Sequence, residues 1–319
     1  MPGDIFTEID NDVMRAFFRN KKKRLVDKTT TAAEAVRKYL KDGDYLAIGG
    51  FGGVRIPTAL IHEVLRQHRK DLGFSGHVST FDCQMLAAGS CFDRCDAAYV
   101  VGLEARGLSR ASRKLFESGN LKVTEWSNGA LAWRFKAAAM GLSYLPIRSM
   151  LGTDTFKYSA AKIIECPFTG KKMGAVPALY PDVAFIHVHR ADVYGNCQID
   201  GIIVADDDIA KASKAVIITT EKIVSNDDIR KEPNRTIIPF WCVDAVVEVP
   251  YGSYPGNMPG LYYSDEAHIA EWLASESDEA KFKEFLDRNI YSCKDFDEYL
   301  KKNGGTKKME ELKKLEHLK

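Results

Sequence analysis

The sequence has no apolar run of the roughly 18–20 residues that a membrane-spanning helix requires. It has no marked excess of either charge, because 45 Lys and Arg residues stand against 44 Asp and Glu residues, for a net charge of +1. That balance argues against nucleic acid, or a strongly charged membrane surface, as a partner. Residues 1–20 are mixed and acidic, without the short apolar core of a signal peptide. These absences predict a cytoplasmic protein that binds neither nucleic acid nor membrane.

Cysteine is scarce, with seven residues in 319. A chain of this length does not need disulfides for stability, and the odd number favours reduced thiols, as in a cytoplasmic protein. Cys91 and Cys95 have a spacing that hints at zinc, but no second pair of Cys or His ligands follows them. His187 and His189 should share one face of a strand, where we expect a hydrogen-bonded structural pair rather than a metal pair. We therefore expect no metal site.

Short apolar runs alternate with helical patterns along most of the chain. The first helical pattern begins at a capping box formed by Thr31 and Glu34. The expected strands are residues 45–48, 97–102, 183–188, 216–220 and 243–249. With 45% hydrophobic residues, the chain can bury a sizeable core. These features predict the α/β class, with a mainly parallel central sheet covered by helices on both faces.

The patterns also divide the chain into three expected parts. Residues 1–30 should form a peripheral N-terminal arm, and residues 31–264 should form the main domain. Residues 265–319 are charged and helical in pattern, and they should form a C-terminal helical extension.

A glycine-rich loop is the sharpest local feature, because the expected strand 45–48 runs directly into Gly49, Gly50, Phe51, Gly52 and Gly53. Glycines let the backbone approach a ligand closely, and a helix that starts after the loop directs its amides at an anion. The spacing fits neither a P-loop nor a dinucleotide-binding fingerprint. We interpret the loop as an anion or acyl-group site at the carboxyl edge of the sheet. The alternative is a tight crossover that only needs positive φ angles.

Three charged residues near expected strand ends are candidates for chemistry. Arg55 could bind a carboxylate or phosphate with two parallel hydrogen bonds, although a surface arginine without a ligand fits the sequence equally well. Glu104 follows the expected strand 97–102, where catalytic carboxylates are often placed. Exposed loop glutamates are nevertheless common. Glu125 stands just before an expected helix, and a role at the helix entry is the simpler interpretation, with Ser127 or Asn128 as the cap.

Residues 42–51, from Asp42 through the strand to Phe51, resemble the alpha-chain signature of the family I CoA-transferases. The family continues to a Gly-x-Pro, whereas this chain has Arg55, Ile56 and Pro57, which is similar to the glutaconate CoA-transferase branch. The turn at 191–196 and the segments 210–224 and 242–262 resemble the same branch. The likeness extends from about Thr31 to Tyr262.

The resemblance implies a partner. In this family a glutamate of the beta chain, within a Ser-Glu-Asn-Gly tract, attacks an acyl-CoA thioester and later carries CoA as a glutamyl thioester. This chain has no such tract, and Ser127, Asn128 and Gly129 echo it without a following glutamate. The nucleophile should therefore come from a beta subunit, in an (αβ)2 or larger assembly. CoA would be a substrate, as a thioester, and no cofactor would be permanently bound.

The resemblance also implies roles for this chain. It should wall the acyl pocket and supply donors to the oxyanion, first from Gly49, Gly50 and Phe51. The pocket would also include three polar or flexible positions and one arginine. These are Gly52, Ser127, Asn128 and Arg55. The arginine suits a dicarboxylic acyl group such as glutaconate.

Two other functions remain open. Some relatives on this scaffold hydrolyse a ring thioester or decarboxylate an acyl-CoA, and then Glu104 or Glu125 would be the general base. A regulatory module that binds CoA esters without turnover is the third interpretation. A Ser-Glu-Asn-Gly tract in the partner would favour the transferase.

Overall fold

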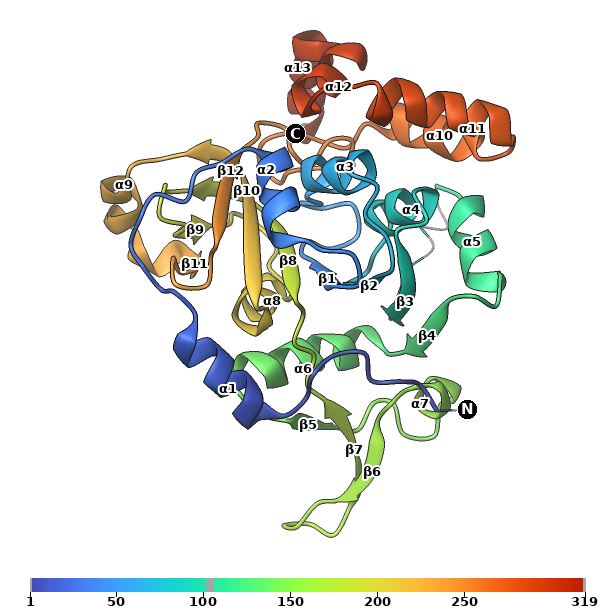
Figure 1. The fold of residues 1–319 in the computed structure, drawn as a ribbon, viewed down its shortest axis with the longest axis vertical. Coiled ribbons are helices and arrows are strands. Elements are labelled where there is room, and N and C mark those ends of the chain that lie inside the picture. The colour runs from blue at the N-terminus through green and yellow to red at the C-terminus, as the bar shows by residue number, and fades with distance from the viewer. Residues whose placement is uncertain (1, 101, 103–105, 318–319) are drawn as a thin grey trace.

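A mainly parallel sheet forms the centre of the molecule (Figure 1). The structure is a computed structural model that describes residues 2–100, 102 and 106–317. The parallel strands lie in the order β12-β10-β8-β1-β2-β3-β4, and β9 and β11 add short antiparallel pairs at the end of β8. Their bounds are β1 Tyr45–Ile48, β2 Leu72–Gly76, β3 Phe92–Ala97, β4 Lys122–Glu125, β8 Val183–Ala191, β9 Cys197–Gln198, β10 Ala215–Ile223, β11 Thr236–Ile238 and β12 Ala245–Glu248.

Helices cover both faces of this sheet, as the sequence predicts. On one face, α2, α3 and α4 pack around a core that includes Val36 and Leu60. On the other face, α6 and α8 pack around a core that includes Phe135 and Ile209. The bounds are α2 Ala32–Tyr39, α3 Thr58–Arg66, α4 Phe81–Ala88, α5 Arg110–Glu117, α6 Asn128–Ala139 and α8 Asp206–Ala212. The predicted α/β class is therefore confirmed, and so is the capping box at the start of α2.

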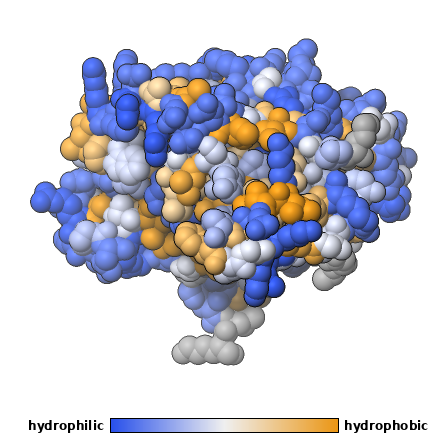
Figure 2. Space-filling view, turned by 90° about the horizontal axis from the view of Figure 1, so that it is seen from below, coloured by the Kyte–Doolittle hydropathy of each residue, from blue (hydrophilic) through white to orange (hydrophobic). Residues whose placement is uncertain are grey.

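The N-terminal segment and a small second sheet lie below the α6 side of the molecule (Figure 1). Helix α1 (Asn11–Asn20) buries Met14 in the same core as α6. The small sheet has the antiparallel order β5-β7-β6, and its β6–β7 hairpin projects from the body. The bounds are β5 Tyr144–Ile147, α7 Asp154–Tyr158, β6 Lys162–Glu165 and β7 Lys172–Pro177. Figure 2 views this underside and shows apolar patches among hydrophilic residues.

The C-terminal helices form a layer beyond α3, at the top of Figure 1. They bury Tyr299 and Met309 against Tyr254 in a core of their own. The remaining bounds are α9 Asn226–Lys231, a 3-10 turn at Pro233–Arg235, α10 Glu266–Ser275, α11 Glu279–Leu286, a π-helical turn at Asp287–Tyr291, α12 Phe296–Lys302 and α13 Gly305–Glu316. The division at residues 30 and 264 stays a prediction. Within the described residues, no helix is both long and apolar enough to cross a membrane.

One predicted strand is wrong. The sequence predicts residues 97–102 as a strand, but the chain pairs as β3 at Phe92–Ala97. The hydropathy pattern misses β3 because the strand carries three charged side chains in six residues. One of them, Asp96, is completely buried and is neutralised by Arg134. Glu104 therefore does not directly follow a strand.

Candidate active site at the carboxyl edge of the sheet

The sheet grows in two directions from β1. The chain adds β2, β3 and β4 on one side of β1 and later adds β8, β10 and β12 on the other. In open parallel sheets, ligands bind beyond the carboxyl ends of the strands at such a switch point. The glycine-rich loop, residues 49–55, leaves the carboxyl end of β1 at this place.

Two glycines allow the loop to fold back on itself. Gly50 has a φ of +87°, and a Cβ at this position would lie 2.5 Å from the carbonyl oxygen of Val54. A Cβ at Gly49 would lie 2.8 Å from a carboxylate oxygen of Asp206. Any larger residue at either position would therefore displace the backbone or a buried carboxylate.

Arg55 fastens the loop to α8. Its side chain and that of Asp206 are both 0% exposed, with Nη2 of Arg55 2.7 Å from Oδ2 and Nη1 3.0 Å from Oδ1 of Asp206. The same guanidinium donates to the carbonyl oxygens of His187 and Ile202. The amide of Gly50 donates to Oδ1 of Asp206 at 2.9 Å. Arg55 thus has its carboxylate partner within the chain, and its predicted role as an acyl-chain ligand stays untested.

The charge of Asp206 depends on this pairing. Burial by itself raises the pKa of a carboxyl group, because it removes water from the charged form. The guanidinium of Arg55 and the hydrogen bonds from Arg55 and Gly50 outweigh burial, so the pKa of Asp206 lies below its ordinary value. Asp206 is therefore an ionised anchor for the loop.

The loop amides differ in what they offer a substrate. The N–H groups of Gly49, Phe51 and Gly52 donate to the carbonyl oxygens of Phe185, Val54 and Val78, respectively. The N–H of Gly50 is taken by Asp206, as above. Among the described residues, no acceptor is bonded to the N–H of the next residue, Gly53. Gly53 therefore carries the loop amide that remains available to an oxyanion.

Arg106 lies over the same position. A Cβ built on Gly53 would be 3.3 Å from Nη1 of Arg106. The other two guanidinium nitrogens, Nε and Nη2, donate to the carboxylate of Glu266. The pair orients Arg106 while Nη1 faces the loop, which places a cationic donor beside the available amide.

Phe51, His77 and Asn128 connect the loop to the start of α6. The rings of Phe51 and His77 lie 5.5 Å apart, and Nε2 of His77 is 2.9 Å from the carbonyl oxygen of Asn128. Burial lowers the pKa of His77, although the hydrogen bond to Asn128 opposes that shift. Ser127 caps α6 by accepting from the amide of Ala130. The structure thus brings the loop near Ser127 and Asn128, and the hydroxyl of Ser127 serves the helix.

Asp82 lies behind the loop in the first turn of α4. It is 1% exposed, and Oδ1 accepts from the amide of Thr80 at 2.8 Å. The hydroxyl of Thr80 in turn donates to the carbonyl oxygen of Gly52 at 2.9 Å. Burial raises the pKa of Asp82 to about 6 in spite of its hydrogen bonds. Asp82 can therefore gain or lose a proton near neutral pH.

Comparison with known proteins fits this site. The family model described as "Coenzyme A transferase" matches residues 29–249. The chain belongs to the CoA-transferase family. The resemblance to the glutaconate CoA-transferase branch is confirmed as well. One of the two kinds of chain in the glutaconate CoA-transferase of Acidaminococcus fermentans is 34% identical over 88% of this chain and 93% of the relative.

Solved structures place this CoA-transferase chain in the same group. The glutaconate CoA-transferase of Acidaminococcus fermentans superposes with a TM-score of 0.84, covering 90% of this chain and 95% of that chain. The decarboxylase AibA/AibB superposes with a TM-score of 0.73 at 31% identity, covering 82% of this chain and 98% of that chain. A component chain of the 3-oxoadipate CoA-transferase of Pseudomonas knackmussii is 34% identical over 84% of this chain and 95% of the relative.

The other predicted residues of this CoA-transferase chain have varied surroundings. Glu104 lies outside the described residues, and Glu125 ends β4 with an exposed side chain. His187 contacts Thr219 and Glu221. His189 bonds to backbone atoms. Among the described residues, no cluster of three or more His, Cys, Asp or Glu could hold a metal ion.

Sequence reasoning missed Arg106, His77 and Asp82. The last two follow β2, whose sequence Leu-Gly-Phe-Ser-Gly is too short and too rich in glycine to stand out as a strand. Its position beside β1 becomes visible only through the pairing of the two strands. Arg106 gave no signal, because the residues that it contacts are distant in sequence.

Proposed function

We propose that this chain is the alpha subunit of a heteromeric CoA-transferase, which moves CoA between an acyl-CoA and a carboxylic acid. One observation carries the proposal. The edge of the sheet offers a donor amide at Gly53 and a cation at Arg106, whereas the carboxylates nearest the loop, Asp206 and Asp82, are 0–1% exposed. A buried carboxylate cannot attack a thioester, so the nucleophile is expected from a beta subunit.

The proposed reaction divides one exchange into easier steps. The partner's glutamate attacks the thioester carbonyl, the carbon–sulfur bond breaks, and CoA leaves as a thiolate. The thiolate then attacks the glutamyl carbonyl of the anhydride, which releases the first carboxylate and leaves a glutamyl-CoA thioester. A second carboxylate reverses these steps. In each tetrahedral intermediate, the Gly53 amide donates to the oxyanion, and Phe51 limits the entry of water.

A dicarboxylic acyl group is the proposed substrate class. Nη1 of Arg106 lies beside Gly53, so a carboxylate remote from the thioester could bind it while the reacting carbonyl approaches the loop amide. Glutaconate and 3-oxoadipate, named for two relatives, are both dicarboxylates. In this proposal Arg106 takes the role that the sequence suggested for Arg55.

The assembly and its setting complete the proposal. We expect an (αβ)2 or larger hetero-oligomer in the cytoplasm, with CoA thioester as substrate and no permanently bound cofactor. The cysteines support a reducing compartment, because all seven are free.

Borohydride trapping of the co-expressed complex tests the proposal. The complex should contain equal amounts of both chains, and acyl-CoA followed by borohydride should abolish activity by reducing a glutamyl thioester on the partner. Mass spectrometry of the separated chains locates the modified glutamate. Transfer by this chain alone, or a reduced glutamate within it, would refute the proposal.

Decarboxylation or hydrolysis of an acyl-CoA is the second candidate function. Two observations favour it: the likeness to a decarboxylase, and the raised pKa of Asp82, which suits an acid–base group. The complex should then release carbon dioxide or free CoA without an acceptor acid. In that case a Gln substitution at Glu104 or Glu125, or Asp82→Asn, should abolish turnover, whereas the transferase should retain most of its activity after Glu104→Gln.

A further inference from the structure

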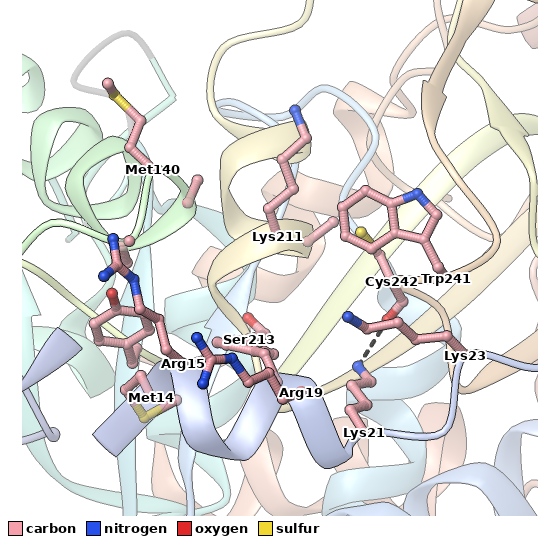
Figure 3. Close-up of a pocket in the computed structure, with 16 residues that line it drawn as sticks. Met14, Arg15, Arg19, Lys21, Lys23, Met140, Lys211, Ser213, Trp241 and Cys242 are labelled. Carbon is pink, nitrogen blue, oxygen red and sulfur yellow. Dashed lines mark hydrogen bonds between the residues drawn. The ribbon is translucent and has the colours of Figure 1, made fainter. Parts of the chain in front are cut away.

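A basic cavity lies at the far end of α6 and α8 from the glycine loop. Helix α6 begins at Asn128, beside His77, and its 12 residues span about 18 Å before it ends. The cavity has a volume of about 380 Å³, which is within the usual range for small-molecule sites. It is lined by α1, by the last residues of α6 and α8, and by Trp241 and Cys242 (Figure 3).

The charged residues that line this cavity are all basic. They are Arg15, Arg19, Lys21, Lys23 and Lys211. Asp12, Asp244 and Asp207 form ion pairs with Arg15, Lys21 and Lys211, respectively. Within the described part of the chain, Arg19 and Lys23 have no carboxylate at ion-pair distance. Figure 3 shows their charged ends directed toward the space between α6 and α8, which gives the cavity two uncompensated cations.

Helix ends explain part of this charge. The carbonyl end of a helix attracts a basic residue in its last turn, and Arg19 stands in the last turn of α1. Lys23, however, lies beyond the helix, and its charge is close enough to Cys242 to act on the pKa of that thiol. The helix end therefore does not account for both free cations.

Tyr180 gives a second, independent indication of a ligand. Its side chain is 1% exposed and lines the cavity, and its hydroxyl has no hydrogen-bond partner among the described residues. Burial raises the pKa of this hydroxyl, while the nearby charge of Arg15 lowers it. A buried hydroxyl without a partner is unfavourable, so a polar ligand atom beside Arg15 would satisfy it.

Apolar groups flank the cations. Trp241 and Met140 line the cavity and are 40% and 57% exposed, respectively, which is unusual for side chains of this size. An indole face at the mouth of a cationic site suits a flat ring. We propose that this cavity binds an organic anion that joins two or more negative charges to a flat ring, the chemical class that includes nucleoside diphosphates. The site is separate from the proposed transfer reaction.

Calorimetric titration of the co-expressed complex with ADP tests this site. We expect saturable binding in the micromolar range, and at least a 30-fold weaker affinity for the double variant Arg19→Glu, Lys23→Glu. The matched control, Lys22→Glu with Arg24→Glu, changes the charge of the same segment by the same amount outside this cavity. The control should keep its affinity within about threefold.

Tyr180→Phe keeps the test independent of folding defects. It removes only the unpaired hydroxyl, so the ligand-free melting temperature should not fall, whereas ADP should bind several-fold more weakly. The site would be refuted if ADP did not bind at millimolar concentration, or if the charge-reversed variant kept its affinity. Loss of ADP binding in saturating acyl-CoA would place ADP in the catalytic site instead. Equal affinity for inorganic pyrophosphate would refute recognition of the ring, and binding to the free chain but not to the complex would show that the partner fills the cavity.

Discussion

Arg55–Asp206 and Arg134–Asp96 are both completely buried ion pairs, yet they hold different parts of the molecule. Asp206 receives the amide of Gly50 as well as the guanidinium, so this pair fixes the loop at the carboxyl edge. Asp96 instead receives the hydroxyl of Tyr45 at 2.5 Å and the indole N–H of Trp126 at 2.6 Å. One pair thus shapes a candidate site, and the other joins β3, β1 and α6 inside the core.

The contrast teaches that burial of a charge does not by itself reveal its role. Both carboxylates lie near the centre of the chain's fold, and each has several donors around it. What differs is the donor beside the arginine: a loop amide for Asp206, and core side chains for Asp96. The effect of each pair on activity should follow that difference, while the effect on stability should be similar.

Removing one carboxylate from each pair should give the largest effects. Asp206→Asn and Asp96→Asn each leave a buried arginine without its counter-charge, so each should lower the free energy of unfolding by about 3–5 kcal/mol. Urea unfolding measures this loss. At a temperature where both variants remain folded, only Asp206→Asn should reduce kcat/KM of the complex, by about a hundredfold. Equal losses of activity would break the distinction between the two pairs.

The same pairs show how far the sequence could be interpreted. The glycine loop and most strands were predictable, because glycine clusters and β-branched runs are local signals. Arg55 and Asp206 stand 151 positions apart, so only the folded chain reveals that the arginine is already paired. The strand β3 stayed hidden for a related reason, since Asp96 counts as a solvent-facing charge until Arg134 is known to neutralise it.

Asp82 sharpens the comparison, because it is a buried carboxyl group without an arginine. Its pKa rises from 3.8 to about 6, so between pH 4 and 6 the native state keeps a proton that the unfolded chain has lost. The free energy of unfolding should therefore fall by about 3 kcal/mol as pH rises through this window, and stay level above it. Asp206 has the opposite sign, since its lowered pKa gives stability that is lost as pH falls through its folded-state pKa.

Asp82→Asn should remove the fall between pH 4 and 6. The check is the difference in free energy of unfolding between the variant and the unmodified chain, measured by urea unfolding at several pH values. Parallel pH profiles of the two proteins would show that Asp82 does not titrate in this range.

Gly50→Ala tests whether the loop itself needs its shape. The substitution places a Cβ 2.5 Å from the carbonyl oxygen of Val54 at a φ of +87°, so we expect a loss of about 2 kcal/mol in stability and at least tenfold in kcat/KM. Gly43→Ala is the matched control, because its φ is +86° and no atom lies within 4 Å of the added Cβ. It should cost about 1 kcal/mol and leave activity unchanged. Similar activity losses in both would remove the special role of this loop.

Arg106→Gln should have the smallest effect, and it tests the outer side of the loop. If Nη1 of Arg106 binds the remote carboxylate of the acyl group, kcat/KM should fall about tenfold for a dicarboxylic acyl-CoA, which corresponds to about 1.4 kcal/mol. A monocarboxylic acyl-CoA of equal length should be affected little. Arg113→Gln provides the control, because Arg113 also pairs with a glutamate, Glu117, but is 57% exposed on α5. An equal loss for both substrates would mean that Arg106 holds the loop through Glu266, in the manner of Arg55, and does not select the acyl chain.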